Sequence, residues 1–234
     1  MKYDELCNFF KSKPKLKQII SFFQKLEDDY SKLNFIFKSL EGKYHNFILY
    51  LVENNEMVDL NNINQIFKEA CISNQLETVK YLYLNYKDKI NINYDDNNIL
   101  YFSIINGHLD IIKWIYSIQP NIIYIERFLD IMWVFPTCYS SKNIELIEWF
   151  WDKSHNKISN NNFIINDCFQ IVCKLSNKTL LDNLENKVKP FLPLDFENNK
   201  ELLSYYDFYE LFFLTCETQN LDFLNYFYKK YQKF

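Results

Sequence analysis

Glycine is nearly absent from this sequence, because the 234 residues contain only Gly42 and Gly107. A glycine-rich phosphate loop, a dinucleotide-binding fingerprint and a Gly-x-Ser-x-Gly nucleophile turn each need more glycines than this, so none can be written. Histidine is also scarce: His45, His108 and His155 are far apart, and no His-Glu-x-x-His zinc pattern occurs. These absences argue against an enzyme, and we expect no cofactor and no metal ion.

Basic segments and long apolar segments are missing as well. The chain has 26 Lys and Arg against 30 Asp and Glu, a formal net charge of −4 and a pI near 5.5. Nucleic acids and anionic membrane surfaces usually require a basic face, so we expect neither as a partner. No apolar run approaches the roughly 18 residues of a transmembrane helix, and the first residues do not open a signal peptide. We therefore expect a soluble, intracellular protein of the cytoplasm.

The main positive feature of the sequence is an internal repeat. Residues 97–119 read NNILYFSIINGHLDIIKWIYSIQ, which predicts a helix, an Asn-Gly turn and a second, antiparallel helix. The same phrase recurs in degraded form at 65–85, and its second half recurs at 140–153 and 215–230. Self-similarity at this period predicts stacked helix pairs.

A Leu or Ile opens the second helix of each good copy and fixes the register. Leu76 and Leu109 are 33 residues apart, and Ile144 follows Leu109 by 35 residues. Leu221 opens the last copy, so we expect these four residues, called anchors below, at equivalent buried sites. The gap between Ile144 and Leu221 leaves room for one more pair.

Two weaker copies complete the series. The missing pair is predicted at 169–187, with Leu180 as its anchor and a shortened second helix. Another copy is predicted at 35–54, with its anchor near His45, about one period before Leu76.

Small residues and turn residues recur in register with the anchors. The residue six places before each good anchor is small, as expected where two helices approach closely: Ala70, Ser103, Cys138 and Thr215. Gly107 lies at the turn where a positive φ is wanted, and Asn74 occupies the same place in the preceding copy. The six cysteines lack metal-type spacing, and Cys71, Cys138 and Cys216 lie at or beside the helix-packing positions. We expect buried free thiols rather than disulfides or metal ligands.

The stretch Asn-Gly-His-Leu-Asp-Ile-Ile at 106–112 resembles the entry to the second helix of the ankyrin-repeat family. The resemblance is good over 61–119, fair at 138–153 and 211–231, and weak elsewhere. It implies repeats of a hairpin-like finger, two antiparallel helices and a loop. The chain departs from the family at Asn98-Ile99-Leu100-Tyr101, which replaces Thr-Pro-Leu-His. It also places Pro136 inside a predicted first helix, which should begin at the proline or break just before it.

We therefore predict an all-α, ankyrin-type repeat solenoid with a helical N-terminal cap. The cap covers residues 1–30, with helices at 4–11 and 16–30 separated by Pro14. The array covers residues 31–234, in approximate units 31–60, 61–93, 94–127, 128–161, 162–203 and 204–234. Asparagine clusters at 54–64, 91–98 and 156–166 mark the loops between helices. Such an Asn-rich composition is typical of AT-biased genomes, for example those of amoebae or giant viruses.

The resemblance also implies a binding surface. Ankyrin arrays usually hold a protein partner with the finger tips and the exposed positions of the first helices, which line a concave groove. Carried onto this sequence, those positions are Asn62, Asn64, Ile72, Ser73, Tyr94, Asp95, Asn97, Ile105 and Asn106, and in the last copy Tyr206, Asp207, Tyr209, Glu217 and Thr218. Aromatics make up 19% of the chain, so Tyr94 and Tyr206 could instead pack against a neighbouring repeat.

The resulting prediction is a non-catalytic protein–protein interaction module whose partner the sequence does not name. His108 is predicted to make a structural hydrogen bond rather than to act in catalysis. The alternative is a structural subunit that packs permanently into a larger complex, for which self-association through the aromatic surface would be the sign.

Overall fold

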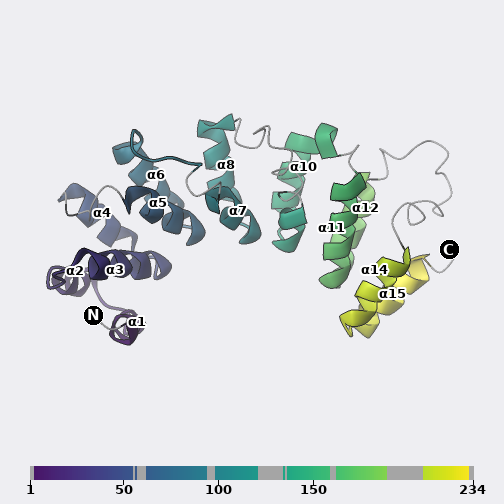
Figure 1. The fold of residues 1–234 in the computed structure, drawn as a ribbon, viewed down its shortest axis with the longest axis horizontal. Helices are drawn as coiled ribbons and strands as arrows, with labels where there is room; N and C mark the ends of the chain where they lie inside the picture. The colour runs from purple at the N-terminus through teal and green to yellow at the C-terminus, as the bar shows by residue number, and fades with distance from the viewer. Residues whose placement is uncertain are drawn as a thin grey trace. The chain divides into compact units, whose positions relative to one another are not determined.

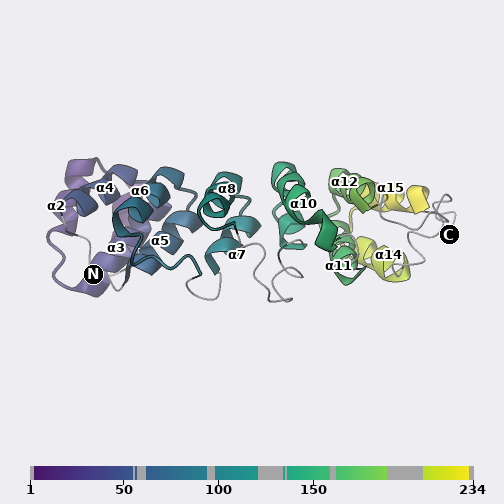
Figure 2. The ribbon, with the colours of Figure 1, turned by 90° about the horizontal axis from the view of Figure 1, so that it is seen from above.

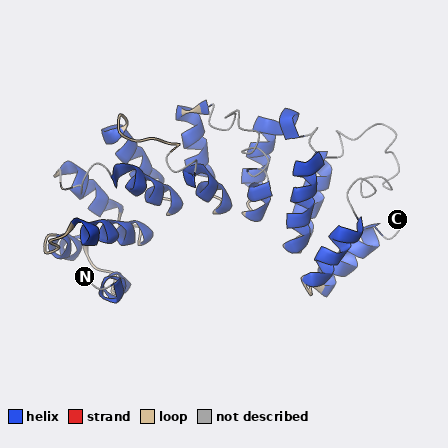
Figure 3. Cartoon of the chain, viewed as in Figure 1, coloured by secondary structure: helices blue, strands red, loops and turns tan. Residues whose placement is uncertain are grey.

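The computed structural model describes residues 3–54, 56, 62–93, 98–120, 134, 136–158, 162–188 and 208–231. The regular structure of these residues is helical, and none of them lies in a strand (Figure 3). The all-α prediction is confirmed. The chain divides into two compact units, residues 1–120 and 121–234, which we call unit 1 and unit 2 and describe separately.

Unit 1 is a double row of helices. The helices are α1 (Tyr3–Lys11), α2 (Leu16–Phe23), α3 (Asp29–Glu41), α4 (His45–Glu53), α5 (Ile63–Ile72), α6 (Leu76–Tyr86), α7 (Asn98–Ile105) and α8 (Leu109–Ile118). In one row α1, α3, α5 and α7 contact each other in order, and in the other row α2, α4, α6 and α8 do so (Figure 2). Helix pairs therefore stack in parallel order, as the repeat predicted.

Unit 2 repeats this arrangement. Its described helices are α10 (Ile144–Ile158), α11 (Asn162–Lys174), α12 (Lys178–Val188), α14 (Phe208–Glu217) and α15 (Leu221–Tyr231) (Figure 1). Helix α11 packs on α12 and on α14, and α14 packs on α15. The core of each unit lies between its two rows, where one apolar stripe of every helix is buried.

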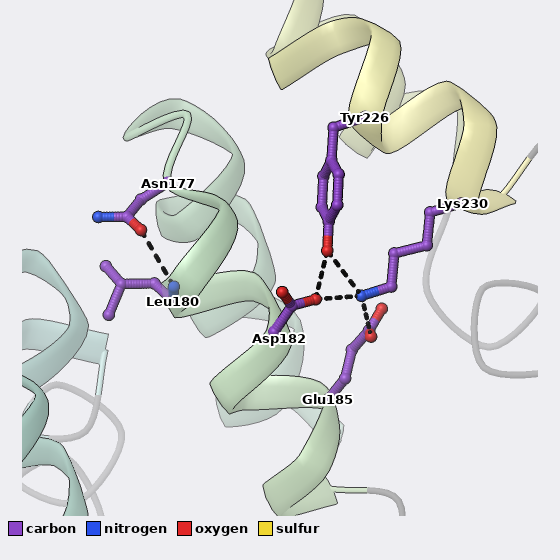
Figure 4. Close-up of polar contacts among 6 residues, drawn as sticks. All are labelled: Asn177, Leu180, Asp182, Glu185, Tyr226 and Lys230. Atoms are coloured by element: carbon purple, nitrogen blue, oxygen red, sulfur yellow. Dashed lines mark hydrogen bonds and ion pairs between the residues drawn. The ribbon is translucent and has the colours of Figure 1, made fainter. Parts of the chain in front are cut away.

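The register predicted from the anchors is confirmed at five of six helix starts. Second helices begin at His45, Leu76, Leu109, Ile144 and Leu221. The sixth, α12, begins at Lys178 and not at Leu180. The reason is a cap: the backbone N–H of Leu180 donates to Oδ1 of Asn177 at 3.1 Å (Figure 4). This bond starts the helix before its first leucine.

A left-handed residue lies two places before each of these helix starts. The six residues are Lys43, Asn74, Gly107, Lys142, Ser176 and Gln219, with φ between 50° and 71°. The sequence predicted this conformation only at Gly107 and Asn74. A side chain with a Cβ adopts it at a cost of about 1 kcal/mol or more, so the stacked pairs must enforce the turn elsewhere.

The small positions are closely packed, as predicted. Ala70, Ser103, Cys138 and Thr215 are each 0% exposed. All six cysteines are free thiols: Cys71, Cys138, Cys168 and Cys173 are buried, and Cys7 is half-buried. Burial raises the pKa of the Cys173 thiol to about 12, which makes it inert at neutral pH. The expectation of burial is wrong for Cys216, which is exposed because α14 belongs to the last described pair of unit 2.

The anchors are less uniformly buried than predicted. Leu109 is buried, whereas Leu76 and Ile144 are half-buried. Leu221 is 71% exposed, so the prediction of a buried site is wrong there. The equivalence of these residues as the first residue of a second helix still holds.

One local prediction needs correction, and another, at Pro136, is not tested by the described residues. The helix predicted at 16–30 ends at Phe23, because Asp28 caps the next helix by accepting a hydrogen bond from the N–H of Ser31 at 2.7 Å. At Pro136, Val134 is helical and so are residues 136–140, and the prediction of a helix that begins at the proline or breaks just before it stays a prediction. Phe135, where a break was the other possibility, lies outside the described residues.

Candidate functional site

The ends of α5 and α7 form the best-defined part of the predicted binding surface. Ile72 is the last residue of α5, and Ile105 is the last residue of α7, 33 positions later. Ser73 and Asn106 follow them at the turns. The two helices are in contact, so the structure brings these four residues to one end of the same row. Ile105 is 37% exposed and Asn106 is exposed, while Ile72 and Ser73 are half-buried.

The backbone beneath this surface is held by His108. Its Nε2 donates to the carbonyl oxygen of Ile72 at 2.8 Å, which ties the end of α5 to the turn of the next pair. The prediction of a structural hydrogen bond for His108 is confirmed. Asn106 donates from Nδ2 to the carbonyl of Phe102 at 2.8 Å, so its amide supports the end of α7. The exposed side chains therefore stand on a fixed backbone.

Tyr101 belongs to this surface and was missed by the sequence analysis. It lies one helical turn before Ile105 and is 42% exposed, so the two side chains make an apolar strip along α7. The next residue, Phe102, receives a cation–π contact from Lys68 of α5, whose Nζ lies 5.8 Å from the ring centroid. The four-residue spacing of Tyr101 and Ile105 was the available signal.

Glu69 gives the same region an acidic component. Its carboxyl is about half-buried, and burial is the main cause that raises its pKa. The positive charge of Lys68 opposes this rise, and the nearby negative charge of Glu41 adds to it. Charged residues are depleted at the centres of protein interfaces, so Glu69 would belong to the rim of a binding surface here.

The remaining predicted residues divide into two groups. Tyr94, Asp95, Asn97, Tyr206 and Asp207 lie outside the described residues, as does the side chain of Tyr209 in α14. Others serve the fold. Asn64 accepts a hydrogen bond from the N–H of Asn91 at 2.6 Å, and Thr218 accepts one from the hydroxyl of Ser176 at 2.7 Å.

A polar cluster lies between α12 and α15 in unit 2, and its lysine can be compared with a catalytic lysine. Lys230 pairs with Asp182 and, at 2.6 Å, with Glu185, while the hydroxyl of Tyr226 donates to Asp182 (Figure 4). Burial alone would lower the pKa of Lys230, but its hydrogen bonds to the carboxylates outweigh burial and raise it. A lysine base or nucleophile needs a lowered pKa, so this cluster is a structural ion-pair network.

Other features of the described residues offer little to a small ligand. A cavity of about 270 Å³ is lined by Phe23, Gln24, Lys32 and Glu56, just below the usual range for ligand pockets. The hydroxyl of Tyr50 donates to the lining residue Glu56 at 2.9 Å. No three His, Cys, Asp or Glu side chains in the described part of the chain are grouped so as to hold a metal ion. None of the described helices combines the length and apolarity needed to cross a membrane.

Comparison with known proteins agrees with the repeat geometry. Residues 67–115, from α5 to α8, match the family model described as ankyrin repeats (many copies). The ankyrin repeat protein L56 of Acanthamoeba polyphaga mimivirus is 31% identical to this chain over 112 residues. That match covers 45% of this chain and 18% of the viral protein, so it spans less than a fifth of the relative's length. No solved structure matches the chain.

Proposed function

Because this chain is an ankyrin-repeat protein, we propose that it is a non-catalytic protein–protein interaction module that holds its partner with the exposed ends of its first helices. Ankyrin repeats are generally protein-binding modules, and that general role supports the proposal. The finger residues Tyr94, Asp95 and Asn97 belong to the same proposal, as do Tyr206, Asp207 and Tyr209. A cytoplasmic location stays a prediction.

The observation that carries the proposal is the exposed strip of Tyr101 and Ile105 on α7. A tyrosine and an isoleucine that are 42% and 37% exposed retain apolar surface that a partner can bury. They lie on a helix whose backbone is fixed by packing against α5 and α8, so little conformational entropy is lost on binding. Large side chains on rigid supports often supply most of the binding energy of an interface.

The test is partner capture by a Tyr101→Ala/Ile105→Ala variant, with proteins from the native cell identified by mass spectrometry. We expect captured partner to fall at least about tenfold, as for loss of interface hot spots. Leu84→Ala is the matched control, because Leu84 is 75% exposed on the second-row helix α6. Circular dichroism should show the same helical signal in all variants. Full capture by the double variant would refute the assignment of this surface.

A further inference from the structure

One carboxylate of α5 lies next to the exposed strip of α7. It belongs to Glu69, which is half-buried and has no hydrogen-bond or ion-pair partner for its carboxylate within the described part of the chain. Lys68 precedes it in sequence, but adjacent side chains of a helix do not face each other. The ammonium of Lys68 instead lies 5.8 Å from the ring centroid of Phe102 on α7. The negative charge of Glu69 is therefore accessible to a partner.

A second carboxylate lies near Glu69 on the side of α3, a helix that also packs on α5. It belongs to Glu41, whose negative charge adds to the rise in the pKa of Glu69. Glu41 pairs with Lys38 at 2.5 Å, yet the Glu41 side chain remains 54% exposed. A positive charge near the two glutamates is attracted by both of them, whereas a negative charge is repelled by both. This part of the surface thus favours a basic side chain.

The surface changes from acidic to apolar along the row of first helices. Glu41, Ile72 and Ile105 are the last residues of α3, α5 and α7, so they hold equivalent places in successive pairs. Tyr101 adds its exposed ring on α7. Packed helices lie about 8 to 10 Å apart. An extended chain rises about 3.3 Å per residue, so about three residues of a bound segment reach from Glu69 to the strip on α7.

We propose that this surface recognises a segment of a protein partner in which a lysine or arginine lies about three residues from a large apolar residue. Recognition of this kind rests on the proposed function, in which the strip of Tyr101 and Ile105 holds the partner. The apolar side chain of the segment packs on the strip, and its basic side chain pairs with Glu69 at the rim. A segment without the basic residue buries the Glu69 carboxylate further with no cation to pair with it, which is unfavourable, so charge contributes to specificity.

The test selects binders of the full chain from a phage-displayed library of random short peptides. Lysine and arginine should be enriched at least about twofold over the unselected library, because complementary charge selects partners. Selection on Glu69→Gln should lose this enrichment and keep the apolar residues. Selection on the control variant Glu77→Gln should keep both. This control removes the same charge from α6, where Glu77 is 72% exposed and pairs with Lys80 of its own helix, so it accounts for the acidity of the whole chain.

The second measurement is the dissociation constant of a selected peptide, by fluorescence anisotropy at low and high NaCl. Glu69→Gln should weaken binding about threefold to tenfold and reduce its salt dependence, as expected for an ion pair at the rim. Circular dichroism should show the same helical signal, since glutamine has the size of glutamate. Peptides that need Tyr101 and Ile105 but bind Glu69→Gln as tightly as wild type would overturn the role of the basic residue and leave the proposed function intact. A library that yields no peptide dependent on Tyr101 and Ile105 would overturn both.

Discussion

One position of the repeat serves different purposes in the two units. It is the residue just before each second helix. In unit 1, Gln75 donates from its side chain to the carbonyl of Leu40, and His108 donates to the carbonyl of Ile72, so both reach back to the preceding pair. In unit 2 this residue is an asparagine that caps its own helix at 3.0 to 3.1 Å, as seen for Asn143, Asn177 and Asn220. A long side chain links neighbouring pairs, and a short one starts a helix.

The units also differ in what links their pairs. In unit 1, the centroid of the Phe35 ring lies 4.9 to 5.8 Å from those of five other phenylalanine rings. The described ion pairs of unit 1 each join two residues of one helix. In unit 2, charged side chains join successive second helices: Glu148 of α10 pairs with Lys187, and Lys230 of α15 pairs with Asp182 and Glu185. The same backbone repeat is thus held by apolar packing in one unit and partly by ion pairs in the other, so salt and pH should separate them.

The largest effect is expected in the aromatic core of unit 1. Phe35→Ala removes a ring that is 0% exposed and should lower the free energy of unfolding of unit 1 by about 3 to 5 kcal/mol. Urea unfolding followed by hydrogen exchange of α1 to α4 measures this change. Phe213→Ala, at a mostly exposed ring, should change stability by less than about 0.5 kcal/mol. A loss below about 1 kcal/mol for Phe35→Ala would mean that the ring cluster contributes little.

A smaller loss is expected when the ion pairs of unit 2 are broken. Lys230→Met should cost about 1 to 2 kcal/mol, between the values for exposed and buried pairs, because the lysine side chain is 27% exposed. The variant should also lose most of the salt dependence of unit 2. Chemical unfolding at low and high NaCl is the measurement, and Lys229→Met, at an exposed lysine, is the control. Equal salt dependence in wild type and Lys230→Met would show that the ion pairs of Lys230 do not contribute to the salt dependence of unit 2.

Acid should weaken the same network. Burial alone would raise the pKa of Asp182, but hydrogen bonds from Lys230 and Tyr226 outweigh it and hold the pKa below its ordinary value of 3.8. Its contribution to stability is therefore present above pH 3.8 and lost as the pH falls through the lower, folded-state pKa. Asp28 in unit 1 has a lowered pKa as well, because the backbone N–H of Ser31 donates to it. The measurement is thus the difference in free energy of unfolding between wild type and Asp182→Asn. This difference should become smaller as the pH falls below 3.8.

Substitution of His108, the residue just before α8, should change the free energy of unfolding only modestly. His108→Ala removes the bond to Ile72 and should cost about 1 kcal/mol. His108→Asn should recover most of this loss, because asparagine can cap α8 as Asn177 caps α12. Thermal unfolding of the two variants gives the comparison. If both variants were equally destabilised, asparagine would not act as a cap at the unit 1 position.

The smallest effect concerns the left-handed turns. Lys142→Gly should stabilise unit 2 by about 0.5 kcal/mol, because glycine adopts the observed φ of 59° without strain but also loosens the unfolded chain. Gly107→Ala should destabilise unit 1 by about 1 kcal/mol at the equivalent turn, where φ is 71°. Urea midpoints measure both. A destabilising Lys142→Gly would show that the lysine side chain contributes more than the strain costs.

Sequence periodicity was sufficient to locate most helix pairs, because apolar spacing repeats with little change. It failed at Leu180, where the cap at Asn177 and not the first leucine sets the start of α12. It predicted the buried small residues but not the left-handed turn at Lys142, since lysine carries no signal for a positive φ. It also predicted a buried Leu221, whereas this first residue of α15 is 71% exposed.

The candidate site was predicted less completely. Ile105 and Asn106 were placed correctly on an exposed helix end, since the family resemblance fixes their position in the repeat. Tyr101 was missed because its exposure depends on how α7 packs against its neighbours. Lys230 and Asp182 form a hydrogen bond although they are 48 positions apart, and their residue types alone do not indicate that they pair.

The most direct test of the account is partner capture by Tyr101→Ala/Ile105→Ala, measured beside the Leu84→Ala control. We expect the double variant to lose captured partner at least about tenfold and the control to keep it. If the double variant captured the partner as wild type does while retaining its helical signal, the ends of α5 and α7 would not be the binding surface and the account would be contradicted.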